Sequence, residues 1–94
     1  MIRHIVMWKF KDGEQQNIEK FLAGLQSLYG VIPQLKAMKI GVNCGKDSNY
    51  DAVLESEFDS LEDLEKYKAH PKHIIVSTLC QSIRLYRCAV DYEI

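Results

Sequence analysis

One short string of the chain carries the residue types that suit acid–base chemistry. It runs Tyr67-Lys68-Ala69-His70-Pro71-Lys72-His73. Proline is favoured in the first turn of a helix, so His73 would lie where the positive end of the helix dipole disfavours imidazolium. A neutral imidazole can accept a proton, and a nearby phenol can donate to a developing oxyanion. The string therefore predicts His73 as a general base and Tyr67 as an acid or oxyanion donor.

A third candidate, His4, lies on an alternating segment at the start of the chain, on the same side as Val6 and Trp8. If that side faces the helices, His4, Tyr67 and His73 could meet in one cleft. A hydrophobic small molecule would then contact a set of residues from the first strand and the first helix. The expected ligand-binding residues are His4, Val6, Trp8, Phe21 and Leu22.

The same residues also fit a purely structural interpretation. Tyr67, Trp8 and Phe21 fall in apolar patterns and are often plain core residues in such patterns. His73 could be a hydrogen-bonded structural residue, and His70, before a proline, could be a helix N-cap or an exposed turn residue. The residue types alone leave both interpretations open.

Metal and cofactor chemistry has less support in the sequence. His70 and His73 are three apart, but the boundary at Pro71 means that they need not share a helix face, and a metal needs three or four ligands. The loop from Gly41 to Ser48 has no GKS or GKT and is not a P-loop. We expect no metal and no organic cofactor.

These residues depend on elements that the apolar pattern predicts. Strict alternation indicates strands over residues 2–10, 35–43, 50–58 and 84–94. Helical spacing of apolar residues indicates helices from Glu14 to Gly30, from Ser60 to the break at His70-Pro71, and over 71–82. Ser60 followed by Asp63 is typical of a helix N-cap.

The order β-α-β-β-α-β predicts a single α+β domain over residues 1–94. This is the ferredoxin-like pattern, a four-stranded antiparallel sheet with helices on one face. The opposite face would keep an apolar set in water, and such patches usually mark an interface. That set is Ile5, Met7, Ala37, Val53 and Ala89. We therefore expect a homodimer that packs sheet on sheet.

Composition excludes several classes of protein. The 94 residues carry 12 Lys and Arg against 13 Asp and Glu, a net charge of −1, which does not suit a nucleic-acid binder. No apolar run approaches the roughly 18 residues of a membrane helix, and the opening residues are unlike a signal peptide. Three widely spaced cysteines without a CxxC pair favour reduced thiols and a cytoplasmic location.

Three segments resemble one known family, the stress-responsive A/B barrel (Dabb) domain. They are the opening Ile2-Arg3-His4-Ile5-Val6-Met7-Trp8-Lys9-Phe10-Lys11, the Tyr67–His73 string, which looks like the family's Y-x-x-H-P-x-H segment, and the ending Val90-Asp91-Tyr92. The resemblance covers essentially the whole chain and implies a dimeric α+β barrel with a cavity between sheet and helices in each chain.

The resemblance also implies roles for residues. The family includes plant stress-related proteins and polyketide cyclases of the olivetolic acid cyclase kind, in which the Tyr and the second His of the segment are catalytic. They correspond to Tyr67 and His73, and His4 becomes a cavity residue. The cyclases have a further third-strand His where this chain has Ala52.

Three functions remain open from the sequence. The first is an enzyme or binder of a hydrophobic small molecule, with an aldol-type cyclisation as a fitting reaction. The second is a non-enzymatic stress protein that acts through its dimeric barrel. The third is a dimeric-barrel oxygenase that needs no cofactor. A cavity of hundreds of Å³ with His73 and Tyr67 facing it would favour the first, and a cavity filled by Trp8 and Phe21 the second.

Overall fold

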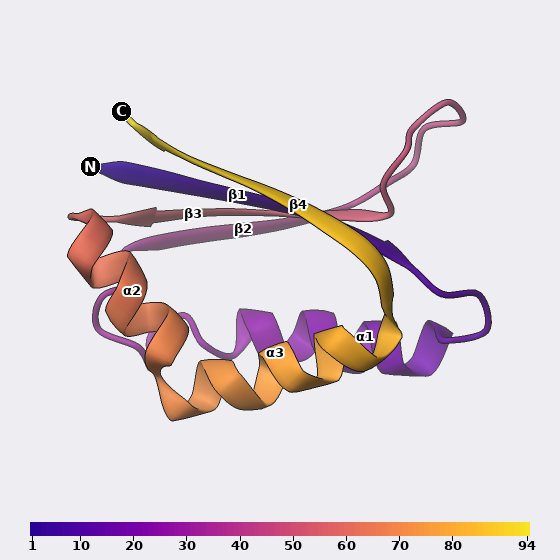
Figure 1. Ribbon diagram of the computed structural model, residues 1–94, viewed down its shortest axis with the longest axis horizontal. Coiled ribbons are helices and arrows are strands. Elements are labelled where there is room, and N and C mark those ends of the chain that lie inside the picture. The colour runs from indigo at the N-terminus through magenta and orange to yellow at the C-terminus, as the bar shows by residue number, and fades with distance from the viewer.

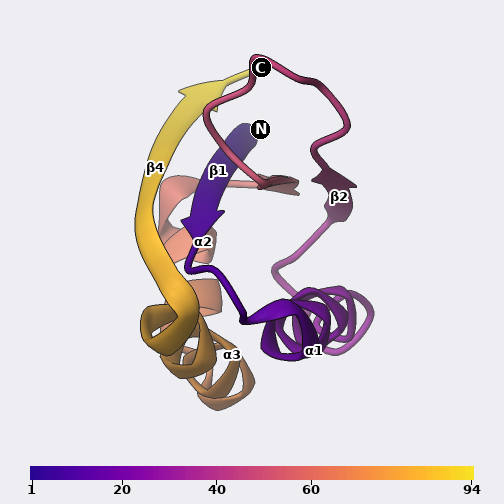
Figure 2. The ribbon, with the colours of Figure 1, turned by 90° about the vertical axis from the view of Figure 1, so that its right-hand side faces the viewer.

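A computed structural model describes all 94 residues. The elements are β1 (Ile2–Phe10), α1 (Gln15–Gln26), β2 (Ala37–Val42), β3 (Ala52–Phe58), α2 (Leu61–Ala69), α3 (Pro71–Ile83) and β4 (Arg84–Glu93). The strands pair antiparallel in the order β2-β3-β1-β4. All three helices lie on one side of this sheet, with α1 and α3 side by side below it (Figures 1 and 2). The predicted ferredoxin-like α+β fold is confirmed.

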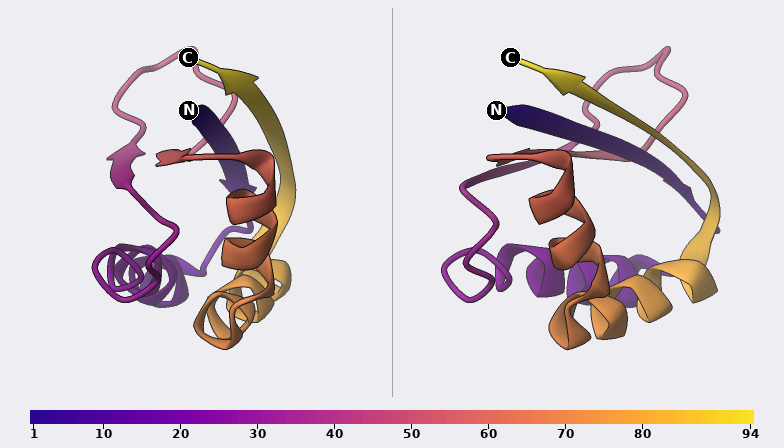
Figure 3. Two further views of the ribbon diagram at one scale, coloured as in Figure 1. Left: turned by 90° about the vertical axis from the view of Figure 1, so that its left-hand side faces the viewer. Right: turned by 60° about the vertical axis from the view of Figure 1, so that its left-hand side comes forward.

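The helix boundaries follow local chemistry. Gly30, with φ of 87°, adopts a left-handed conformation in the turns that follow α1. The Ser60 hydroxyl accepts a hydrogen bond from the backbone N–H of Asp63 at 3.1 Å, which confirms the predicted N-cap of α2. Pro71 then begins α3, and α2 descends from the sheet to meet α3 at an angle (Figure 3). None of the three helices is long and apolar enough to cross a bilayer.

The core lies between the helices and one face of the sheet. Alternate residues of β1 point into it and are 5% exposed or less, and the same alternation holds along β3. Phe58 and Ile83 are fully buried, and Trp8 packs edge-on against Phe21 with ring centroids 5.1 Å apart. The helix-facing side of β1 is therefore the side with His4, as predicted.

The outer face of the sheet has no covering layer within the chain. Met7 pairs with Val53 on one side and with Cys88 on the other, and Ile5 pairs with Val90, so these side chains share the outer face. The expected outer-face set is correct except for Ala89, which was wrong. Ala89 pairs with Val6 and faces the helices, because the register of β4 puts its larger apolar residues outside. Those residues are Tyr86, Cys88, Val90 and Tyr92.

Candidate functional site

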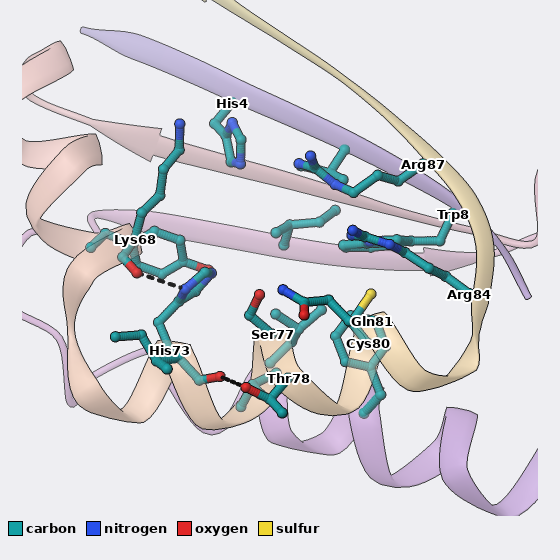
Figure 4. Close-up of a pocket in the computed structure, with 17 residues that line it drawn as sticks. His4, Trp8, Lys68, His73, Ser77, Thr78, Cys80, Gln81, Arg84 and Arg87 are labelled. Carbon is teal, nitrogen blue, oxygen red and sulfur yellow. Dashed lines mark hydrogen bonds between the residues drawn. The ribbon is translucent and has the colours of Figure 1, made fainter.

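A cavity of about 430 Å³ lies between the sheet and the helices. Its 17 lining residues come from β1, β3, β4 and all three helices (Figure 4). His4, Tyr67 and His73 all line it, so the structure brings the three predicted residues together. Trp8 and Phe21 form part of its wall and do not fill it. A cavity of this size is typical of small-molecule sites.

Four of the five expected ligand-contacting residues, His4, Val6, Trp8 and Phe21, line this cavity, whereas Leu22 does not. Leu22 lines a separate groove beside the turn between β1 and α1. On α1, Phe21 and Leu25 line the cavity, whereas Leu22 lines this groove. The contact of Leu22 with a ligand of the cavity stays a prediction.

His73 is held in one tautomer by its own backbone neighbourhood. The ring Nδ1 lies 3.1 Å from the carbonyl oxygen of Lys68, which can only accept, so Nδ1 carries the proton. In the neutral ring, Nε2 then keeps its lone pair. Burial, above all, lowers the pKa of His73, and the nearby His4, Lys68 and Arg87 lower it further, against the hydrogen bond to Lys68. His73 is therefore a neutral base at pH 7, and burial rather than the helix dipole is the main cause.

Tyr67 combines a structural ring with an unused hydroxyl. The residue is 1% exposed, and its ring lies 5.0 Å from that of Phe58 and 4.5 Å from that of His73. Its hydroxyl is buried and has no hydrogen-bond partner. Burial raises the pKa of Tyr67, so the phenol keeps its proton and remains a donor. A buried donor without a partner is rare and costly, and it belongs to one of the residues that line the cavity.

The structure gives His4 a carboxylate partner. His4 lies on β1, directly opposite Asp91 of β4, and its Nδ1 forms a short hydrogen bond to the Asp91 carboxylate. Burial lowers the pKa of His4, and the carboxylate opposes this effect. Alternation along the last strand offers no signal for this pair, because Asp91 shares the alternating set of Ala89, which that pattern places on the opposite face.

His70 lies outside the cavity and is partly exposed. Its Nδ1 accepts a hydrogen bond from the backbone N–H of Lys72 at 3.1 Å and caps α3. One of the two roles considered for it, the helix N-cap, is therefore confirmed. Nowhere in the chain do three or more His, Cys, Asp or Glu side chains gather as a metal site would need.

A profile of the Stress responsive A/B Barrel Domain matches residues 2–94. The chain belongs to the Dabb family. Stress-response A/B barrel domain-containing protein HS1 of Arabidopsis thaliana is 30% identical over 96 aligned positions, covering 98% of this chain and 88% of HS1. Olivetolic acid cyclase of Cannabis sativa is 29% identical over 77 positions, covering 78% of this chain and 76% of the cyclase.

Among solved structures, a dimeric ferredoxin-like protein of unknown function from Bacteroides fragilis NCTC 9343 superposes with a TM-score of 0.91. It is 26% identical, and the match covers 99% of this Dabb chain and 95% of the other. The fold of the Dabb chain is thus that of a protein described as a dimer.

The cavity of this Dabb protein also holds three cations that the sequence analysis did not place there. They are Lys68 of α2 and Arg84 and Arg87 of β4. Figure 4 shows Lys68 near His4 and His73, Arg84 beside Trp8, and the side chain of Arg87 extending toward His4. Arg87 was missed for the same reason as Asp91: directly opposite Trp8, it lies on the helix side of β4.

Proposed function

We propose that this Dabb protein is a cofactor-independent enzyme that binds a hydrophobic carbonyl compound in its cavity and promotes an intramolecular, aldol-type cyclisation. One observation carries the proposal. The unpartnered Tyr67 hydroxyl and the neutral His73 ring adjoin each other on a cavity of about 430 Å³. A donor and a base at one cavity are what proton abstraction next to a carbonyl requires.

The two residues have complementary roles in such a reaction. His73 Nε2 takes a proton from the carbon next to a carbonyl group, and the resulting carbanion attacks a second carbonyl of the same molecule. A carbon–carbon bond forms, and the electron pair of the attacked C=O moves to its oxygen. The Tyr67 hydroxyl donates to this oxyanion, and the imidazolium returns the proton to it, so that both residues end as they began.

Burial supports both roles. The phenol stays protonated because burial raises the pKa of Tyr67, and the imidazole stays neutral because burial lowers the pKa of His73. Hydrogen bonds to a developing charge are also stronger where water is excluded. The likeness to olivetolic acid cyclase, at 29% identity, supports a cyclisation as the reaction class.

The outer sheet face supports a homodimer as the working form. Met7, Val53 and Val90 lie together there without a covering layer in the chain, and the similar Bacteroides fragilis protein is described as dimeric. We also assign the protein to the cytoplasm, which its three free cysteines support.

The test is turnover of linear polyketide-like thioesters and acids, followed by the appearance of a ring product. Variants H73A and Y67F should each lose a factor of about 10²–10⁴ in kcat/KM. The matched control is H70N, which changes a neighbouring histidine outside the cavity and keeps a side chain suited to capping α3.

Thermal unfolding of all variants separates a catalytic loss from a folding defect. H73A and Y67F should unfold within a few degrees of the wild type. No turnover and no binding by the wild-type protein would overturn the proposed activity and favour the non-enzymatic stress protein. Equal losses in H70N would show that His73 and Tyr67 have no special role.

A further inference from the structure

We propose that the cavity is built for a carboxylate-bearing ligand, with Arg84 and Arg87 binding the carboxylate at the end away from His73. The inference rests on the proposed function and narrows its substrate class to acids with an apolar chain. The first observation is the charge of the wall. Lys68, Arg84 and Arg87 line the cavity, and none of the 17 lining residues is an Asp or Glu.

The excess of positive charge in the cavity wall is not a property of the whole chain. The chain has 13 acidic residues and only 12 basic ones, with a net charge of −1. A cavity wall with three cations and no carboxylate therefore departs from the composition around it. Clustered cations repel one another, and a bound anion would relieve that repulsion.

The two arginines also have no carboxylate partner within the chain. The ion pairs of the structure involve six other basic residues, including Lys68, which lies 3.3 Å from Glu65. Neither Arg84 nor Arg87 has a carboxylate within ion-pair distance. Guanidinium groups bind carboxylates through paired, charge-assisted hydrogen bonds, and here both groups are available for them.

The register of β4 directs Arg87 into the cavity. Arg87 pairs with Trp8 on β1, and residues directly opposite in an antiparallel pair point to the same face. Arg84 ends α3 and begins β4, and it lies beside the thiol of Cys80, another lining residue. Figure 4 shows Arg84 beside Trp8 and the Arg87 side chain extending toward His4, with Lys68 and His73 on the far side of His4.

The wall between the two ends is apolar. Val6, Phe21, Leu25 and Leu54 all line the cavity. A ligand with a carboxylate at the arginines would lay an apolar chain along these residues and present a distant carbonyl to His73 and Tyr67. The positive charge of Arg87 lowers the pKa of both His4 and His73, in agreement with a side chain that extends toward His4.

Binding of octanoate tests the inference without reference to turnover. The matched neutral probe is octanamide, and octyl phosphate tests for a different anion. Trp8, the only tryptophan, lies in the cavity wall, so its fluorescence reports binding of each probe at pH 7 and low salt. We expect octanoate to bind roughly tenfold more tightly than octanamide, because charge-assisted hydrogen bonds from a guanidinium to a carboxylate are stronger than those to a neutral amide.

Variants assign this preference to residues. R87Q and the double variant R84Q/R87Q should remove most of the tenfold preference and leave octanamide binding unchanged. The control K72Q removes an exposed cation that does not line the cavity, and it should keep the preference. If the double variant unfolds, R87Q alone still tests the preference for octanoate. Arg87 lies within β4, away from the end of α3, so its substitution should leave that helix end unchanged.

Three results would overturn the inference. Equal affinity for octanoate and octanamide would show that the arginines do not select a carboxylate. Tighter binding of octyl phosphate would assign the arginines to phosphate esters. An unchanged preference in R87Q and R84Q/R87Q would place the anion elsewhere. The proposed cyclisation fails separately, when linear substrates are bound but not turned over.

Discussion

The two faces of the sheet are built by the same strands but differ in what covers them. On β1, the helix-facing residues His4, Val6 and Trp8 are 5% exposed or less. Their neighbours Ile5 and Met7 point outward and are only partly buried. On the same outer face, three residues of β4 are 42–54% exposed, namely Tyr86, Val90 and Tyr92.

The three helices of this small chain can cover only one of the two faces of the sheet. Helices α1, α2 and α3 supply one covering layer, and that layer protects the face that carries the cavity. The outer face keeps an apolar surface that a second copy would cover. The proposed assembly and the proposed chemistry thus use opposite faces, so substitutions on each face should have separate effects.

The largest effect should come from a charge on the outer face. Met7→Glu places a carboxylate between Val53 and Cys88 and should convert the homodimer into a monomer of 10.9 kDa or make it insoluble. Sedimentation at micromolar concentration measures the change. Leu61→Glu is the control, because Leu61 is an exposed apolar residue on helix α2 and not on the outer face of the sheet. A monomeric wild type, or a dimeric Met7→Glu variant, would contradict the prediction that the outer sheet face is the dimer interface.

A second comparison uses adjacent residues of β3. Leu54 faces the core and is 2% exposed, whereas Val53 faces outward. Leu54→Ala should lower the free energy of unfolding by about 2–5 kcal/mol, because it leaves a cavity in the core. Val53→Ala should cause a smaller loss. Urea denaturation at matched protein concentration gives both values, and equal losses would show that the two faces are packed alike.

Acid should destabilise the helix-facing side. Burial lowers the pKa of His73 below its ordinary value of 6.5, so the unfolded chain binds more protons than the folded chain near that pH. Stability should therefore be full above pH 6.5 and fall as the pH drops below it. Thermal unfolding across this range should show a shallower fall in H73N. A melting temperature that is constant or rises on acidification would rule out this effect.

The smallest expected change in stability comes from removing the hydroxyl oxygen of Tyr67. Tyr67→Phe removes a buried hydroxyl without a partner, so it should leave the free energy of unfolding unchanged or raise it by up to about 1 kcal/mol. Tyr92→Phe is the outer-face control and should stay within about 0.5 kcal/mol, because the Tyr92 hydroxyl is exposed and accepts only a long bond from Arg3. Calorimetry measures both, and a loss above about 1 kcal/mol in Tyr67→Phe would reveal a hidden partner of its hydroxyl.

Local patterns were enough to predict the order of the elements and the inward face of β1. Alternation along residues 2–10 separates the two faces, and Pro71 breaks the helix wherever the rest of the chain lies. The closeness of Tyr67 and His73 also followed from the sequence, because they flank one short helix break. The resemblance to the Dabb family added His4 to the same cavity, and the fold placed it there.

Only the tertiary structure decided the faces of β4. Both of its alternating sets contain apolar residues, so alternation alone favours placing the larger set, with Tyr86 and Val90, against the helices. Pairing with β1 does the opposite and brings Arg87 and Asp91 to the cavity side. A shift of one residue exchanges the faces of a strand, and the register of β4 shifts beside Lys9 and Phe10. Pairing between residues 74 to 91 positions apart in the chain sets that register, and no local pattern records it.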